Sequence, residues 1–134
     1  MAYRRPSQEY ERDSEGYIII NGGKHKFTDE KVKVCGTAVV TVRGSSEVVA
    51  YDSSKVVAHG FSAVYAYDFS RVEAYVFSIV YACNSSKVYA HDSSKVYAHD
   101  SSKVVAYDSS KVVAYDSSKV YFRDSAKIVE DNRR

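Results

Sequence analysis

An apolar residue recurs at every eighth position along most of the chain. The series runs without a break through Val32, Val40, Val48, Val56, Val64, Val72, Val80, Val88, Val96, Val104, Val112, Val120 and Ile128. The fullest form of the eight-residue unit is V-V-A-Y-D-S-S-K, whose first four positions alternate with a period of two. Such alternation is typical of a β-strand, and helical repeat units are longer, at about 20 residues or more. The pattern predicts an all-β protein with one short strand in each unit.

Comparison of the units with one another shows which positions accept change. Counted from the recurring apolar residue, position one is always Val or Ile, position three is mostly Ala, and position seven is Ser from Ser46 to Ser118. Positions two and four vary among Val, Tyr, Glu, His, Cys and Arg. We therefore expect the odd positions to face the core. Asp or Gly at position five suits a corner, because these residues tolerate left-handed backbone dihedrals.

The length of the unit indicates how the strands are arranged. Eight residues supply one wall and a closed coil needs two, so the sequence predicts a flattened, two-sided parallel β-solenoid with about 16 residues per coil. Coils stacked at about 4.8 Å would give about six coils in a rod near 30 Å long. The alternative is a meander of antiparallel strands. The D-S-S-K segment lacks the Asn-Gly or Gly-Gly pair typical of tight hairpins, which favours the solenoid.

The segments outside the repeat predict how the chain is divided. Residues 1–16 are polar and charged, and we expect a flexible tail. Residues 17–31 read as strand, turn and strand, so we predict an N-terminal β cap, with Ile18 and Ile20 lying over the first coil. The repeats of residues 32–134 form the solenoid.

Near the end of the chain the repeat changes in a way that would finish the core. The small inward residue of position three is replaced by Phe122 and then by Glu130. A large ring followed by a charge would plug the core and then close it. The polar residues Asp131 and Arg133 would discourage further stacking of strands on the exposed end.

With 16 residues in a coil, residues 16 apart form columns on the outer faces. One face would carry the columns Val49, Tyr65, Tyr81, Tyr97, Val113 and Cys35, Tyr51, Tyr67, Cys83, His99, Tyr115. The other would carry Thr41, Val57, Glu73, Tyr89, Val105, Tyr121 and Arg43, His59, Tyr75, His91, Tyr107, Arg123. Stacked rings that shield the backbone would need no ligand, whereas Tyr-rich flat surfaces also suit the binding of proteins. The sequence alone leaves both interpretations open.

Three successive units depart from the template by carrying Phe at position six, where other units have Ser or Thr. They are Phe61, Phe69 and Phe77, and Ala63, Val76 and Ile79 are further apolar residues nearby. Phe61 and Phe77 are 16 residues apart and should share one edge, with Phe69 on the other. The N-terminal segment could fold over this patch, but we favour a homodimer or protein-partner interface. The predicted interface consists of Phe61, Phe69, Phe77, Ile79, Tyr65, Tyr67 and Tyr81.

The charge pattern argues against nucleic acid as a partner. The chain has 134 residues, enough for one domain, with 19 Lys and Arg against 17 Asp and Glu and a formal net charge of +2. Each corner Asp of the repeats precedes a Lys, or in one unit Arg71, by three residues, as Asp108 precedes Lys111. We therefore expect each column of Lys to be offset by a column of Asp.

No constellation of catalytic residues stands out. The D-S-S segments repeat Ser and Asp in identical copies, whereas a catalytic Ser is singular, and no phosphate-binding loop or dinucleotide motif occurs. Cys83 and His99 are expected neighbours that could form an activated thiol or half of a metal site, but no third Cys or His falls beside them. We predict no enzyme activity, no metal and no cofactor.

The same sequence features indicate a cytoplasmic protein with no membrane partner. No apolar run approaches the roughly 20 residues that cross a bilayer, and the N-terminal residues lack the hydrophobic segment of a signal peptide. Cys35 and Cys83 lack the dense spacing of a disulfide scaffold and would lie three coils apart, so we expect free thiols.

The run A-Y-D-S-S-K-V-V-A-Y-D-S-S-K-V resembles the short octapeptide repeats of small bacterial and phage β-solenoid proteins, and the resemblance covers residues 32–131. It implies a non-enzymatic protein-binding module, and a phage or mobile-element inhibitor of a host defence enzyme such as a CRISPR nuclease. The coil also resembles bacterial ice-nucleation proteins and flat insect antifreeze solenoids, although their Thr ladders are missing and Thr41 stands alone within the repeats. Ice binding and single-stranded nucleic-acid binding are the alternatives.

Overall fold

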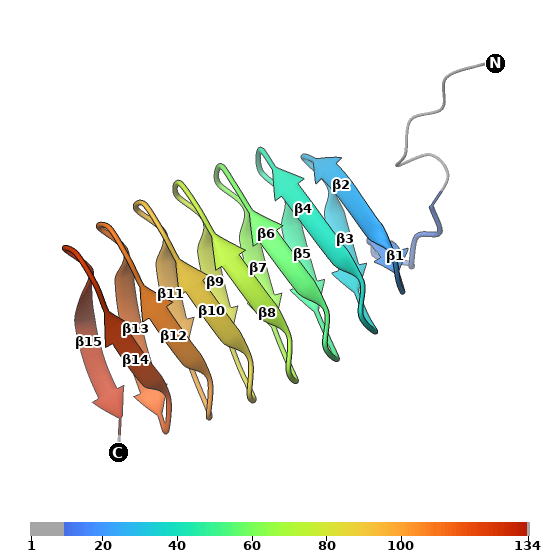
Figure 1. Cartoon of the computed structure of the whole chain (residues 1–134). Helices are drawn as coiled ribbons and strands as arrows, with labels where there is room; N and C mark the ends of the chain where they lie inside the picture. Colours follow the sequence, from blue (N-terminus) through green and yellow to red (C-terminus); the bar gives the residue numbers. More distant parts are fainter. Residues whose placement is uncertain (1–9, 134) are drawn as a thin grey trace.

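The strands of the protein form two sheets, within which each strand pairs with the strand one coil away. The computed structural model describes residues 10–133 (Figure 1). The odd sheet contains, in spatial order, β1 (Ile18–Ile20), β3 (Lys31–Val34), β5 (Glu47–Ala50), β7 (Ala63–Ala66), β9 (Ile79–Ala82), β11 (Lys95–Ala98), β13 (Lys111–Asp116) and β15 (Lys127–Arg133). The even sheet contains β2 (Lys24–Thr28), β4 (Val39–Arg43), β6 (Lys55–Ala58), β8 (Arg71–Ala74), β10 (Lys87–Ala90), β12 (Lys103–Ala106) and β14 (Lys119–Phe122).

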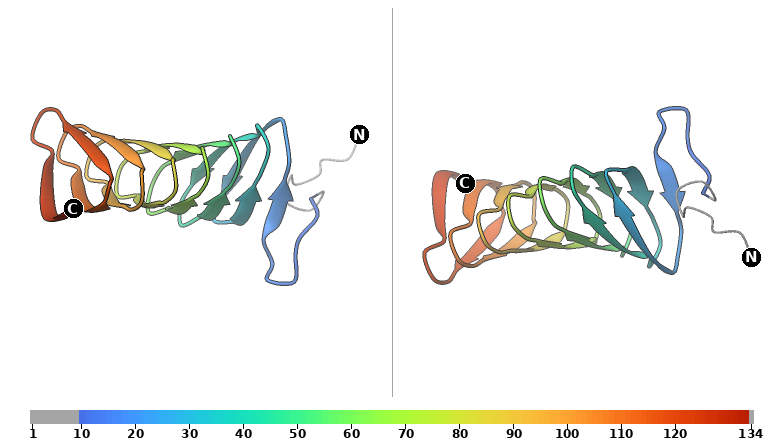
Figure 2. Two further views of the ribbon diagram at one scale, coloured as in Figure 1. Left: turned by 90° about the horizontal axis from the view of Figure 1, so that it is seen from below. Right: turned by 90° about the horizontal axis from the view of Figure 1, so that it is seen from above.

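The register confirms the predicted solenoid. All pairings between these strands are parallel, and partners are 16 residues apart through the repeats, as Val88 is from Val72 and Val104. The chain makes about 7 turns of this kind, about one more than expected, because β1 and β2 add a coil before the repeats. The views from below and above show the coils stacked along one axis (Figure 2). Parallel pairing excludes the antiparallel meander.

The core is a narrow double row of small side chains. Position one and position three are fully buried in the central coils, as at Val88 and Ala90, which are 0% exposed. Position seven is also buried, and Ser54 donates its hydroxyl to the carbonyl of Tyr51 at 2.7 Å. Position five does not face the core, because it forms the corner, so the expectation of uniformly inward odd positions is wrong there. Each buried Val contributes about 1.5–3 kcal/mol relative to an exposed one.

The N-terminal segment differs from the expected cap. The strands of residues 17–31 are part of the solenoid, because β1 pairs in parallel with β3, and β2 with β4. Residues 10–16 lie against this first coil: Ile19 donates its N–H to the carbonyl of Glu11 at 2.9 Å, and the ring of Tyr10 packs edge-on against Phe27. Of the expected flexible tail over residues 1–16, residues 10–16 thus contact the first coil, and residues 1–9 lie outside the described residues.

The C-terminal end also differs from the expectation. Phe122 pairs with Ala106 in the last strand of the even sheet and is 41% exposed, so it lies at the end of the core, and its role as a plug stays a prediction. The register of β15 shifts beside Val113, which pairs with Glu130 and is an outward position. Asp131, not Glu130, therefore takes the place opposite the inward Ala114.

Candidate functional site

The corners determine which side chains reach the surface. Position five adopts a left-handed conformation, with φ near 60° at Asp92 and 57° at Asp100. The carboxylate of Asp100 accepts a hydrogen bond of 2.8 Å from the N–H of Asn84, one coil earlier, and Asn84 accepts one from the N–H of Asp68 in the same way. The corner residues thus form ladders of side-chain-to-backbone hydrogen bonds along the edges. The sequence analysis explained Asp at the corners by its tolerance of left-handed dihedrals. It did not predict the hydrogen-bond ladder, which the 16-residue spacing of these Asp residues indicates.

One edge lacks the acceptor side chains of the ladder over three coils. Where the chain passes from an even strand to the next odd strand, position five is Gly44, then Gly60 and then Val76 in place of Asp. The two coils of Gly60 and Val76 differ further from the template. Val76 has a φ of 64°, a conformation that a β-branched residue rarely adopts. None of these three residues supplies a carboxylate or amide acceptor to the coil before it.

The same two coils carry a compact apolar surface, which we call the apolar edge. It consists of Phe61, Ala63, Val76, Phe77 and Ile79. The rings of Phe61 and Phe77 stack with their centroids 5.4 Å apart and their planes 8° from parallel. These two side chains are nonetheless 69% and 53% exposed, so the stack shields only the faces that the rings turn towards each other. Residues 10–16 and β1 contact the first coils and leave these rings open.

The predicted interface residues fall into separate groups. Ile79 belongs to the apolar edge, and Tyr65 and Tyr81 adjoin it, because each follows an apolar-edge residue by two positions on the outer face of the odd sheet. Their rings stack 4.9 Å apart. Phe69 lies on the opposite edge, 72% exposed, and Tyr67 precedes that corner. The structure therefore brings Phe61, Phe77, Ile79, Tyr65 and Tyr81 together, and Tyr67 lies beside Tyr65 at the far end of the odd-sheet face. Phe69 is on the opposite edge.

The aromatic columns form as predicted. On the even sheet His59, Tyr75, His91 and Tyr107 stack in sequence, with centroid distances of 5.0, 4.7 and 4.7 Å. Each interior ring has another ring on both faces, so the column presents ring edges to the outside. This supports the interpretation that the stacks shield and stabilise the sheet.

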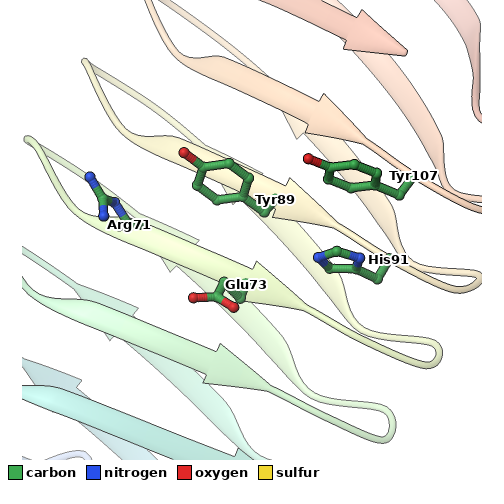
Figure 3. Close-up of a pocket in the computed structure, with 5 residues that line it drawn as sticks. All are labelled: Arg71, Glu73, Tyr89, His91 and Tyr107. Atoms are coloured by element: carbon green, nitrogen blue, oxygen red, sulfur yellow. The ribbon is translucent and has the colours of Figure 1, made fainter. Parts of the chain in front are cut away.

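A shallow groove lies beside this stack (Figure 3). It is lined by Arg71, Glu73, Tyr89, His91 and Tyr107. Burial tends to raise the pKa of Glu73, but hydrogen bonds from Lys55 and Tyr75 outweigh it and hold that pKa below its usual value. Glu73 is thus a carboxylate already engaged by neighbours of its own sheet.

The thiol of Cys83 shows no sign of activation. Burial raises the pKa of the Cys83 thiol, and the charge of Asp100 raises it further, which opposes formation of a thiolate. Both Cys83 and Cys35 are free. Within residues 10–133 no group of three or more His, Cys, Asp or Glu is placed to hold a metal ion, and no helix is long and apolar enough to span a bilayer.

Comparison with known proteins finds no relative of the chain. The chain matches no family model, no curated protein and no solved structure. The fold is a parallel β-solenoid of two sheets. The apolar edge and the outer faces of the sheets are therefore the features from which a function can be inferred.

Proposed function

We propose that the protein is a non-enzymatic binding module that holds a protein partner at the apolar edge. The exposure of the stacked pair Phe61 and Phe77 is the observation that carries this proposal. Two large rings, with Val76 and Ile79 38% and 37% exposed beside them, form contiguous apolar surface of the kind that marks interaction sites.

The departures from the template are concentrated at this surface. Positions five, six and eight, which are elsewhere mostly Asp, Ser and Lys, are all uncharged at Gly60, Phe61 and Ala63, and again at Val76, Phe77 and Ile79. Val76 also retains a strained backbone that Asp, Asn or Gly would relieve. A residue that is poorly suited to its backbone conformation, as Val76 is, and that brings no structural benefit is typical of a functional site.

Charged residues border the apolar edge along the solenoid axis. In the position-eight column of the odd sheet, Glu47 precedes Ala63, and Lys95 follows Ile79. An apolar centre with a charged rim is the usual composition of a protein interface. The adjoining Tyr65 and Tyr81 would extend the contact surface with rigid rings.

The class of partner comes from the sequence resemblance. The octapeptide-repeat proteins of phages imply a host defence enzyme, such as a CRISPR nuclease complex, as the target, with the host cytoplasm as the location. A second copy of the chain is the other protein partner that the apolar edge fits, because two such edges would bury one another.

The test removes the rings from one edge at a time. If the native chain dimerises, its average molar mass in light scattering rises with concentration, and we expect the double variant Phe61→Ser with Phe77→Ser to abolish that rise. If the native chain instead captures a purified partner, we expect the same double variant to abolish the capture. Phe69→Ser is the matched control, because it removes a similarly exposed ring from the opposite edge. A double variant that behaves as the native chain does, or a native chain that stays monomeric and captures nothing, would refute the proposal.

A further inference from the structure

The outer face of the even sheet has a charge composition very different from that of the whole chain. Of the 19 Lys and Arg, the even-sheet strands carry Lys24, Lys26, Arg43, Lys55, Arg71, Lys87, Lys103 and Lys119 on this face, and Arg123 directly follows β14. Of the 17 Asp and Glu, Glu73 alone lies on the outward positions of these strands. The near-neutral net charge therefore conceals a strongly basic face.

Five of these side chains form one unbroken column. Cα pairing runs through Lys55, Arg71, Lys87, Lys103 and Lys119. At about 4.8 Å per coil the column is about 19 Å long. Like charges on directly paired strands repel one another and destabilise the sheet. An anion bound along the column would reduce this repulsion.

The Asp carboxylates of the adjacent corner point along the edge of the solenoid rather than towards this column. The carboxylates of Asp52, Asp68, Asp100 and Asp116 each accept a backbone N–H from the coil before, at 2.8 to 3.1 Å. Within residues 10–133, Lys55 is the one member of the column in an ion pair, at 3.1 Å from Glu73. These carboxylates keep their negative charge, so the expected offset between the Lys and Asp columns acts across the corner rather than through ion pairs.

The middle of the face also offers a place for a base. Tyr89 pairs with Glu73 on one side and with the smaller Val105 on the other, and Tyr121 follows Val105. Tyr89 and Tyr121 are thus two coils apart, about 10 Å, which is enough for a planar ring between them over Val105. The basic column and Tyr107 flank the column of Tyr89 on the outer face, two positions before it and two positions after it. Figure 3 shows Arg71 of the basic column, Tyr89 and Tyr107.

We propose that the even-sheet face binds a single strand of nucleic acid, with its phosphates along the basic column and a base between Tyr89 and Tyr121. A uniform array of identical charges has no unique register, so it fits a polymer with a repeating charge better than a folded acidic protein. Electrostatic tracking of the backbone combined with stacking on aromatic rings is the usual mode of single-strand binding. This surface is distinct from the apolar edge.

The test measures anisotropy of a labelled 20-nucleotide oligothymidylate at increasing salt. If all five charges of the column engage phosphates, the slope of log affinity against log salt is about −3.5. We expect Lys87→Glu with Lys103→Glu to weaken binding by at least about tenfold. The matched control is Lys95→Glu with Lys111→Glu, which changes the same position of the repeat and the same net charge on the odd sheet, and should bind as the native chain does.

A second variant separates base from backbone. Tyr89→Ala should weaken oligothymidylate binding by about tenfold and leave the binding of inorganic polyphosphate unchanged. Circular dichroism checks that each variant is folded. The proposal is overturned if the native chain does not bind the oligonucleotide at low salt, if both charge variants weaken binding equally, or if duplex DNA or phosphatidylserine vesicles bind more tightly than the single strand.

Discussion

Replacement of Val76 by Asn tests how the corners stabilise the solenoid. Val76 is the one β-branched residue among the left-handed positions of residues 10–133, with a φ of 64°. Its side chain supplies no acceptor to Gly60, which occupies the same corner one coil earlier. Asn tolerates the left-handed conformation, and Asn84 already shows that an amide oxygen completes the ladder, at 2.9 Å from the N of Asp68.

The expected gain is the sum of two small terms. A left-handed conformation costs a side chain other than Gly, Asn or Asp about 1–2 kcal/mol, and an exposed hydrogen bond contributes about 0.5–1.5 kcal/mol. Val76 is 38% exposed, so most of the residue is covered and the apolar area lost on its replacement offsets part of this gain. We therefore expect Val76→Asn to raise the free energy of unfolding by about 1–3 kcal/mol, or the melting temperature by about 3–5 °C for each kcal/mol.

The assay is urea unfolding followed by circular dichroism, with Val76→Gly as the companion variant. Gly relieves the backbone conformation and adds no acceptor, so the Asn variant should be the more stable of the two by about the value of the hydrogen bond. A Val76→Asn chain that is less stable than the native one would refute the strain argument. An Asn variant that is no more stable than the Gly variant would refute the ladder.

Two further predictions concern the corner Asp residues and the thiols. Asp100→Asn should leave the free energy of unfolding nearly unchanged. Asp100→Ala should lower it by about 2 kcal/mol, because Ala lacks both the tolerance of the left-handed conformation and the acceptor for the N–H of Asn84. Urea unfolding measures the stability of both variants. Because burial and Asp100 raise the pKa of Cys83, its alkylation should be slower at neutral pH than that of a free cysteine and should accelerate only at more alkaline pH; a rate profile as fast as that of a small thiol would contradict this.

The eight-residue unit was sufficient to predict the fold, because the inward, outward and corner positions recur at the same spacing in every unit. Alternation placed Val88 and Ala90 in the core, the 16-residue coil placed Tyr65 over Tyr81, and the spacing of Phe61 and Phe77 placed both on one edge. In each case the neighbours in space follow from the period alone. The separation of Phe69 from that edge follows from the same arithmetic.

The ends were less predictable because the repeat no longer determines the neighbours there. The strand, turn and strand of residues 17–31 looked like a separate cap, since their apolar residues do not follow the octad; the pairing of β1 with β3 shows that they continue the sheets. The register shift beside Val113 likewise depends on one extra residue in β15, and moves Glu130 to an outward position. The direction of the Asp carboxylates, along the edge rather than towards Lys, required coordinates.

The two candidate surfaces illustrate how a repeat determines what it can bind. A regular period produces identical groups at about 4.8 Å intervals, and such an array is complementary to partners that are themselves periodic, as the basic column is to a phosphate backbone. A unique partner needs a place where the period is broken. The apolar edge is that place, and Val76 retains there a backbone conformation that Asn or Gly would adopt with less strain. If both surfaces act as proposed, Val76→Asn should stabilise the chain and weaken partner binding together, while oligonucleotide binding on the even sheet stays unchanged.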